Sequence, residues 1–431
     1  MEAFSERRRR LLDKIDGALL LFSTPVAYRN SDVEHEYRQD SDFFYLSGFA
    51  EPESVLLLTT RHEEHRAVLF VRPRDPEREI WDGERAGVDG AVSHYGFDAA
   101  YPISELAEKL PRYLTGVSRL YHRLGAHRPN DDRVLDAIGR VRGRGRTKEA
   151  WPTEIVDPAT VLHEMRLVKT EQEIAVMRRG AEITRDAHIA AMRLAAPGRY
   201  EYELEAALRD VFRKHGAERT AYEPIVGSGH NATVLHYRTN NRRMEDGDLV
   251  LIDAGCEYGY YACDVTRTFP VSGAFTPAQR RVYEVVLESQ RAAIEATKPG
   301  ISVDDVHDVA VKVIAAGLVE LGLVEGPTEK VIEERTYRRY YMHRTSHYLG
   351  MDVHDVGPYF AGGKPRPLEA GMVITVEPGI YIRKGDATVP AEYRGIGIRI
   401  EDDVLVEAGG NRVLTGDIPR TVDDIEHACR A

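Results

Sequence analysis

The stretch DAGCEYGYYACD, residues 253–264, predicts a β-hairpin with an aspartate at each end. We expect the chain to turn at Tyr258 and Gly259, although Tyr-Gly is not the favoured Asn-Gly pair and a longer or bulged turn stays open. Asp253 then lies directly opposite Asp264, on the same face of the sheet and with Cβ atoms about 5 Å apart. Two like charges so placed repel each other unless a cation lies between them. Taken alone, the pair is weak evidence for a metal, because aspartates near turns are more often caps than metal ligands.

Further along the chain, histidines and carboxylates cluster in glycine-rich, strand-like segments. Alternate residues of a strand share a face, so Arg399 and Glu401 are expected on the same side. A carboxylate between apolar strand neighbours is costly unless it is paired or binds a metal. Any one of the histidines, taken singly, is more readily interpreted as a hydrogen-bonded core residue, but their clustering with carboxylates weakens that interpretation. The residues concerned are His343, His347 and His354 in MHRTSHYLGMDVHDVG (342–357), Glu377 in VITVEPG (373–379), and Arg399 and Glu401 in GIGIRIED (395–402).

Length and composition are typical of a globular protein: 431 residues allow two to three domains of roughly 150 residues, with 42% hydrophobic and 30% charged residues. The formal net charge of −12 disfavours nucleic acid as a main partner, and the basic stretch RVRGRGRTK (140–148) is interpreted as a solvated loop. Three cysteines without a C-x-x-C pair are expected to be unbridged thiols in a reducing compartment. The best apolar run, Ala18–Phe22, is too short to span a membrane, so a cytoplasmic location is expected.

The pattern of apolar residues predicts an α/β (α+β) protein with two domains. Residues 1–168 contain short apolar runs bounded by turn or charged residues, which favour a mixed sheet with flanking helices. Residues 169–431 open with a capping box in which Thr170 and Glu173 satisfy the first turn of a helix. Further helices are expected to start at Tyr200, Thr276 and Ser302.

Eight segments in a fixed order resemble the pita-bread metallopeptidases, and within them the aminopeptidase P group. The resemblance covers nearly the whole chain. It implies an N-terminal aminopeptidase-P-like domain and a C-terminal pita-bread domain with a curved, mainly antiparallel sheet and metals on its concave face. The segments are YRQDSDFFYLSGF (37–49), EIWDG (79–83), LHEMRLVKT (162–170), VGSGHNATVLHY (226–237), DAGCEYGYYACDVTRTFP (253–270), HRTSHYLGMDVHDVG (343–357), TVEPGIY (375–381) and GIGIRIEDDVLV (395–406).

The resemblance implies a site for two divalent metal ions. Its implied ligands are Asp253, Asp264, His347, Glu377 and Glu401. Four carboxylates balance the charge of two divalent cations, and an oxygen-rich ligand set favours a hard ion such as manganese. Cys263 neighbours a ligand in sequence but would point to the opposite face of a strand, so it is not expected to bind metal.

The resemblance also implies roles for other residues around a metal-bridged hydroxide. The implied catalytic residues are Glu377 as proton shuttle, His354, His236 and Arg399, and the implied substrate-binding residues are His236, His343, His354, Tyr381 and Trp81. Arg399 would orient a carboxylate. Trp81 is interpreted either as an ordinary core tryptophan or as an aromatic residue that reaches the pocket of a neighbouring subunit.

The expected activity is that of a metallo-exopeptidase which releases the first residue of peptides with proline second, in a homo-oligomer (dimer or tetramer). The first alternative is a prolidase, which would share the fold and ligands but cleave Xaa-Pro dipeptides only. The second is a catalytically inactive pita-bread binding module, which the complete ligand set disfavours. Methionine aminopeptidase is disfavoured by the long N-terminal region.

Overall fold

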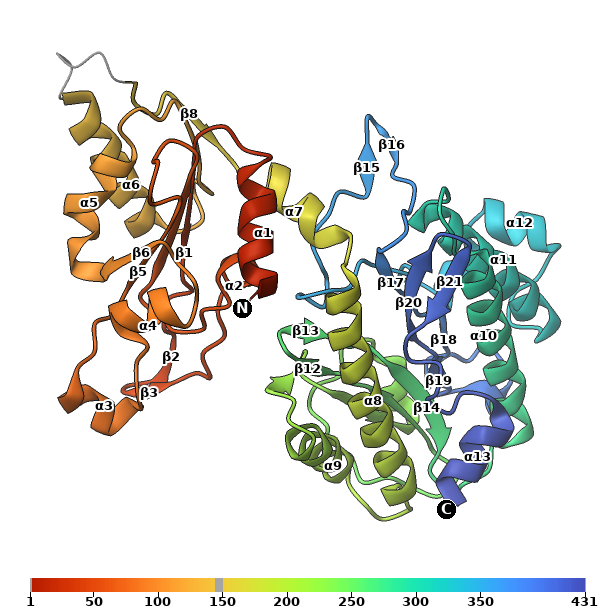
Figure 1. The fold of residues 1–431 in the computed structure, drawn as a ribbon. Coiled ribbons are helices and arrows are strands. Elements are labelled where there is room, and N and C mark those ends of the chain that lie inside the picture. Colours follow the sequence, from red (N-terminus) through yellow and green to blue (C-terminus); the bar gives the residue numbers. More distant parts are fainter. Residues whose placement is uncertain (1, 144–149, 431) are drawn as a thin grey trace. The chain divides into compact units, whose positions relative to one another are not determined.

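The computed structural model describes residues 2–143 and 150–430 (Figure 1), so most of the basic stretch interpreted as a loop lies outside the described residues. The chain divides into two compact units that part between Met165 and Arg166. The mixed α/β fold expected from the sequence is confirmed. Among the described residues, no helix combines the length and apolar character needed to cross a membrane.

The first unit is built on one six-stranded sheet, in which β1 pairs with β4 antiparallel and with β7 parallel, as expected for a mixed sheet. The strands of this sheet are β1 (Ala18–Phe22), β4 (Val55–Thr59), β5 (Ala67–Val71), β6 (Ala99–Pro102), β7 (Arg119–Tyr121) and β8 (Glu154–Val156). A separate antiparallel pair is formed by β2 (Tyr28–Asn30) and β3 (Val33–Glu34). The helices of the unit are α1 (Glu2–Leu12), α2 (Ser41–Ser47), α3 (Pro76–Asp82), α4 (Gly87–Ser93), α5 (Leu106–Tyr113) and α6 (Arg128–Gly143), and α7 (Ala159–Leu167) leads into the second unit.

In the second unit every strand pair of the described residues is antiparallel. Figure 1 shows α8 and α9 on one side of these strands and α10 and α11 on the other. The helices are α8 (Glu171–Leu194), α9 (Glu201–Lys214), α10 (Pro277–Ala296), α11 (Val303–Glu320), α12 (Thr328–Glu333) and α13 (Val422–Arg430). The strands are β9 (Arg219–Thr220), β10 (Ile225–Ser228), β11 (Leu249–Asp253), β12 (Cys256–Tyr258), β13 (Tyr261–Ala262), β14 (Thr266–Pro270), β15 (Phe360–Ala361), β16 (Lys364–Pro365), β17 (Val373–Val376), β18 (Gly379–Tyr381), β19 (Gly397–Arg399), β20 (Asp402–Glu407) and β21 (Gly410–Val413).

The helix starts predicted from local signals are confirmed. Thr170 and Glu173 form the predicted capping box at the start of α8. Tyr200 precedes α9, and Thr276 and Ser302 cap α10 and α11 through their hydroxyls. These signals are reliable here because a cap satisfies backbone N–H groups only three residues away.

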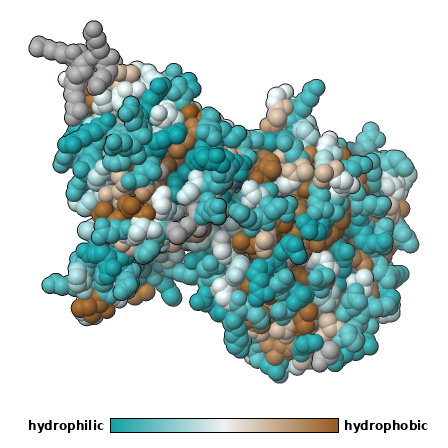
Figure 2. All heavy atoms as spheres, viewed as in Figure 1, coloured by the Kyte–Doolittle hydropathy of each residue, from teal (hydrophilic) through white to brown (hydrophobic). Residues whose placement is uncertain are grey.

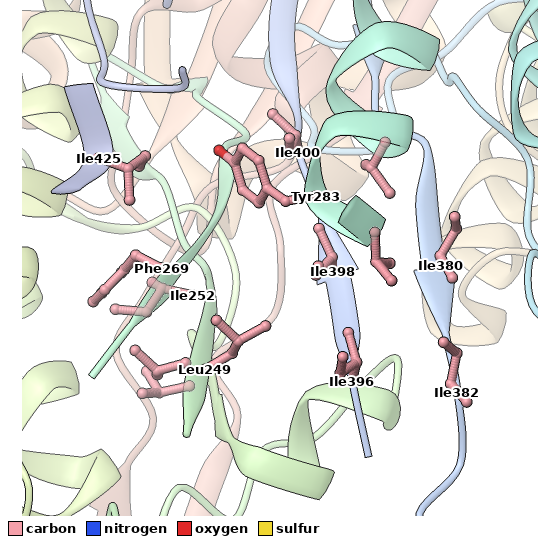
Figure 3. Packing of buried hydrophobic residues seen from close by; sticks show 14 of the residues in the cluster. Leu249, Ile252, Phe269, Tyr283, Ile380, Ile382, Ile396, Ile398, Ile400 and Ile425 are labelled. Carbon is pink, nitrogen blue, oxygen red and sulfur yellow. The ribbon is translucent and has the colours of Figure 1, made fainter. Parts of the chain in front are cut away.

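The apolar core of the second unit fixes which strand face is left for the site (Figure 3). Ile398 and Ile400 are fully buried in a cluster that includes Tyr283 of α10. Because side chains alternate along a strand, Arg399 and Glu401 point to the other face, where they line a cavity. The segment thus packs a helix with one face and builds the site with the other.

The hairpin register predicted from the sequence is wrong by two residues. Tyr258 pairs with Tyr261, and Asp253 pairs with Thr266 rather than with Asp264. The turn therefore centres on Gly259 and Tyr260, whose φ angles of 56° and 67° are both in the left-handed region that a two-residue hairpin turn requires. A slip of two residues keeps every side chain on its face, so both aspartates still point to the same side.

Candidate active site

A cavity of about 910 Å³ in the second unit gathers most of the residues singled out in the sequence. The predicted residues that line it are His236, Asp253, Asp264, His343, His347, His354, Glu377, Arg399 and Glu401. Tyr381 does not line the cavity, and Trp81 belongs to the first unit. Residues from five separate sequence segments therefore converge on one space.

Strand ends position the acidic residues. Asp253 is the last residue of β11, Glu377 directly follows β17, and Glu401 directly precedes β20. The strands around Glu401 are tied together because its backbone N–H donates to the carbonyl of Thr266 at 3.1 Å, and the Thr266 hydroxyl donates to Glu401 Oε2 at 2.6 Å. Sheet pairing rather than loop conformation holds these carboxylates.

Three of the predicted metal ligands form a tight group: Asp264, His347 and Glu401 each offer a ligand atom, and these atoms lie within 4.8 Å of one another. The Nε2 atom of His347 lies 3.4 Å from Asp264 Oδ2 and 3.7 Å from Glu377 Oε1. Its Nδ1 lies 3.0 Å from the carbonyl oxygen of Tyr348, which can only accept, so Nδ1 keeps a proton and Nε2 is the nitrogen that can bind a metal once it gives up its own proton.

Tyr222 is a site residue that the sequence reasoning missed. Its hydroxyl lies 2.5 Å from Asp253 Oδ1 and 2.5 Å from Asp264 Oδ1, so one O–H group bridges both carboxylates. Burial and the charge of these two aspartates raise the pKa of Tyr222 well above its usual value. Nothing in the sequence distinguishes it from the other members of a set of 22 tyrosines.

The concentration of buried negative charge at the cavity floor fits a cationic occupant. Burial raises the pKa of Asp253, raises that of Glu377 to about 8 and raises that of Glu401 well above its usual range. Mutual repulsion adds to burial, since Asp264 raises the pKa of each of these groups. A buried carboxylate is stabilised by pairing with a positive charge or a metal, and the four carboxylates with one imidazole suit two divalent cations.

Arg399 directly contacts the group of buried carboxylates. Among the described residues that line the cavity floor, it is the one arginine or lysine that does so. Its Nη2 donates to Asp253 Oδ2 at 2.5 Å, its Nε to the Thr266 hydroxyl at 3.0 Å and its Nη1 to the Tyr381 hydroxyl at 3.0 Å. The guanidinium thus orients the Asp253 carboxylate, as expected for a residue that positions a ligand.

The predicted substrate-binding residues divide into internal and exposed groups. His343 Nδ1 lies 2.7 Å from the Arg344 carbonyl and its Nε2 lies 2.8 Å from the Tyr381 hydroxyl, so the ring is neutral and held at both nitrogens. Burial and the nearby Arg399 lower the pKa of His343 to about 3. His354 and His236 are exposed at the cavity, and the His354 ring lies 4.4 Å from the His347 ring in an edge-to-face arrangement.

Trp81 is 84% exposed on α3, and its neighbour Ile80 is 81% exposed. Figure 2 shows the corresponding hydrophobic surface over α3. The interpretation of Trp81 as a core tryptophan is therefore wrong. Its contact with a neighbouring subunit stays a prediction.

Cys263 packs away from the cavity, against Ala181, Val265 and Ile418, as expected for a residue on the opposite strand face. Burial raises the pKa of this thiol well above its usual value, which leaves it protonated. All three cysteines are free.

The metal-free protein should lose stability as the pH rises from 6.5 to 8. The folded-state pKa of Glu377, about 8, exceeds its ordinary 4.5, and that of His347, about 9, exceeds 6.5 because Asp264 and Glu377 outweigh burial. The folded state therefore binds more protons than the unfolded state in this window, and stability falls by at most about 1.4 kcal/mol per pH unit for each group. The opposing effect of His343, whose folded pKa is depressed, acts below pH 6.5.

Urea unfolding in the presence of a chelator, at pH 6.5 and pH 8, measures this dependence. The midpoint should be lower at pH 8, and saturation with a divalent metal should remove the loss. A midpoint that is equal or higher at pH 8 without metal would contradict the assignment of these shifted groups.

Comparison with known proteins identifies the same architecture. The family described as metallopeptidase family M24 matches residues 175–408, and the one described as aminopeptidase P, N-terminal domain, matches residues 4–121. The chain is 45% identical to an Xaa-Pro aminopeptidase of Escherichia coli (strain K12), over 99% of this chain and 97% of that protein. It is similar to the structure of Pseudomonas aeruginosa aminopeptidase PepP, with a TM-score of 0.98, 48% identity, and coverage of 100% of this chain and 98% of that one. For zinc-substituted Escherichia coli aminopeptidase P in complex with product, the TM-score is 0.96, the identity 45%, and the coverage 100% and 98%.

Proposed function

The chain belongs to metallopeptidase family M24 and carries the aminopeptidase P N-terminal domain, and from this premise we propose that it hydrolyses the Xaa-Pro bond and releases the N-terminal residue of peptides with proline second. The observation that carries the proposal is the convergence of four carboxylates and the Nε2 atom of His347 at the floor of one cavity. Burial of several carboxylates close together destabilises a protein unless a cation balances their charge, so a binding module that holds no metal would not be expected to have this arrangement.

Two divalent cations held by Asp253, Asp264, His347, Glu377 and Glu401 would supply an acidified water molecule as nucleophile and polarise the scissile carbonyl. Glu377 accepts a proton from the attacking water on a carboxylate oxygen and delivers it to the proline nitrogen, which leaves as an amine. We propose manganese as the metal because oxygen ligands outnumber the single nitrogen.

The exposed imidazoles suit contact with the substrate. His354 and His236 line the cavity, where they can donate to a peptide carbonyl and stabilise the negative charge that develops on it. His343 and Tyr381 are hydrogen-bonded to each other, and the Tyr381 hydroxyl also accepts a hydrogen bond from Arg399. These bonds hold the cavity wall beside Glu377 in place. Because the Xaa-Pro amide has no N–H and its ring fixes φ, recognition depends on shape and on donors to carbonyl oxygens.

We propose that the protein is a cytoplasmic homo-oligomer, a dimer or a tetramer. Three unbridged cysteines suit a reducing compartment. The exposed Trp81 and Ile80 on α3 form an apolar surface that a second subunit would cover, and Trp81 would then lie close to the peptide in the neighbouring cavity.

Incubation with Ala-Pro and Ala-Pro-Ala, each with manganese or with a chelator, tests the proposed activity. Mass spectrometry should detect manganese-dependent release of Ala from the tripeptide. Cleavage of the dipeptide alone would make the protein a prolidase. No cleavage of either peptide by the metal-loaded protein would refute the proposed substrate class and restore the binding-module alternative.

A further inference from the structure

The loop of residues 348–357, which contains His354, is folded onto a buried ion pair. The backbone N–H of Asp355 donates to the carbonyl of Tyr348 at 2.9 Å, which closes the loop on itself. His354 projects from this loop into the cavity, whereas the side chain of its neighbour Asp355 points the other way and is 1% exposed. Adjacent residues of the loop thus face the substrate space and the protein interior.

Two basic residues bind the Asp355 carboxylate on its buried side. Lys169 Nζ donates to Asp355 Oδ2 at 2.9 Å and Arg166 Nη2 donates to Asp355 Oδ1 at 2.7 Å. Arg166 Nη2 also reaches Oδ2 of Asp352, in the same loop, at 2.7 Å. The Lys169 and Arg166 side chains are only 1% and 3% exposed, so these charge-assisted bonds are shielded from water.

The loop backbone packs closely against this carboxylate. A Cβ at Gly350 would lie 2.0 Å from Asp355 Oδ2 and 2.9 Å from Lys169 Cε, so glycine is required there for close approach. Lys169 is itself fixed, since its backbone N–H donates to the Gly371 carbonyl at 2.8 Å. Lys169 and Arg166 therefore hold the loop of residues 348–357 in a fixed position.

The position of the His354 imidazole depends on Lys169 and Arg166, because the imidazole itself makes few contacts. Among the described residues, the structure records for the His354 imidazole an edge-to-face contact with His347 and no hydrogen bond or ion pair. The position of the ring is thus set by its backbone, and the backbone is set by Asp355.

We propose that Lys169 and Arg166 are positioning residues for hydrolysis, which act through Asp355 to place the His354 imidazole against the substrate carbonyl. The inference rests on the proposed function, in which His354 contacts substrate. It assigns a role in turnover to the segment LHEMRLVKT, residues 162–170, in which neither residue touches the cavity.

The variant Lys169→Met tests this inference, because it removes one of the two cations and leaves Arg166 to pair with Asp355. We expect kcat/KM for Ala-Pro-Ala to fall about tenfold, the scale of losses when a group that orients an active-site residue is removed. Manganese affinity, measured by isothermal titration, should stay within about twofold, since no metal ligand is touched. Lys169→Gln keeps an N–H donor for the carboxylate and should lose less activity.

A double-mutant cycle separates positioning from general destabilisation. In a His354→Ala background, Lys169→Met should lower kcat/KM by less than about twofold, because the residue to be positioned is gone. Arg242→Met, which breaks a partly buried ion pair with Asp248 outside the cavity, is the matched control for lost stability and should leave kcat/KM unchanged.

Equal losses from Lys169→Met with and without His354 would overturn the positioning role, and so would an unchanged kcat/KM in Lys169→Met and Lys169→Gln. Failure of the proposed function is distinct, because the unaltered protein would then cleave neither peptide. A parallel fall in manganese affinity would also overturn the inference.

Discussion

The substitution Asp264→Asn should lower kcat/KM for Ala-Pro-Ala by about a thousandfold or more, since Lewis-acid stabilisation by a bound metal is worth several kcal/mol and each 1.4 kcal/mol is about tenfold in rate. Asp264 belongs to the tight ligand group with His347 and Glu401. Its Oδ1 meets the Tyr222 hydroxyl and its Oδ2 lies 3.4 Å from His347 Nε2, so both oxygens are in use. An amide offers one weaker oxygen donor and cannot balance metal charge.

Stability should respond in the opposite direction. In the metal-free protein at a pH above the His347 pKa of about 9, where that imidazole is neutral, D264N removes a charge that raises the pKa of neighbouring carboxyl groups, so its melting temperature should equal or exceed that of the unaltered protein. Addition of manganese should then raise the melting temperature of the unaltered protein but not that of the variant.

The matched control is Asp248→Asn, which breaks an ion pair with Arg242 in the same unit but outside the cavity. It should keep its manganese affinity and turnover. A D264N protein that binds manganese with unchanged affinity and retains activity would remove Asp264 from the metal site.

The substitution Arg399→Lys should lower kcat/KM by about 10–100-fold, the range seen when a residue that orients a metal ligand is lost. Each of the three guanidinium nitrogens of Arg399 has a different partner, namely Asp253, Thr266 and Tyr381. A lysine ammonium keeps the charge but cannot span the three positions, so the substitution is not conservative at this site. The loss should appear together with weaker metal binding, because the Asp253 carboxylate is no longer held.

Arg344→Lys provides the control at the cavity rim. Arg344 forms an exposed ion pair with Asp304, and exposed pairs of this kind contribute about 0–1 kcal/mol. Its kcat/KM should change by no more than about twofold. Equal losses in both variants would show that an arginine-to-lysine change anywhere at the cavity impairs turnover, and would contradict a specific positioning role for the Arg399 guanidinium.

The sequence predicted features that depend on near neighbours. Thr170, Thr276 and Ser302 start helices because capping involves residues only a few positions apart. The shared strand face of Arg399 and Glu401 follows from the two-residue period of a strand. The alternation of isoleucines with charged residues in GIGIRIED already indicates which face of the strand is apolar and which face carries Arg399 and Glu401.

The hairpin register was wrong because it depends on contacts across the fold. A turn at Gly259 and Tyr260 places a tyrosine at a φ of 67°, which its own sequence disfavours. Two distant interactions accompany this conformation: the Glu218 carboxylate accepts from the Gly259 N–H at 3.0 Å, and the Arg219 guanidinium lies over the Tyr260 ring. Neither Glu218 nor Arg219 can be matched to the turn from sequence spacing.

Long-range partners also account for the residues that were missed. The Tyr222 hydroxyl meets carboxylates that follow it by 31 and 42 residues, and Asp355 meets cations that precede it by nearly 190. Such pairs arise from the packing of complete strands and helices, so composition and periodicity contain no signal for them. The family resemblance implied the ligand set and the orienting role of Arg399, but neither Tyr222 nor the cations that bind Asp355.

The alternation of Ile398 and Ile400 with Arg399 and Glu401 couples correct strand pairing to chemistry. A slip of one residue would place both charged side chains in the apolar core and an isoleucine at the cavity floor. A misaligned molecule therefore loses a proposed metal ligand and its core packing in the same event. The number of metal ions bound per protein molecule would therefore measure the fraction of molecules whose strands have paired in the native register.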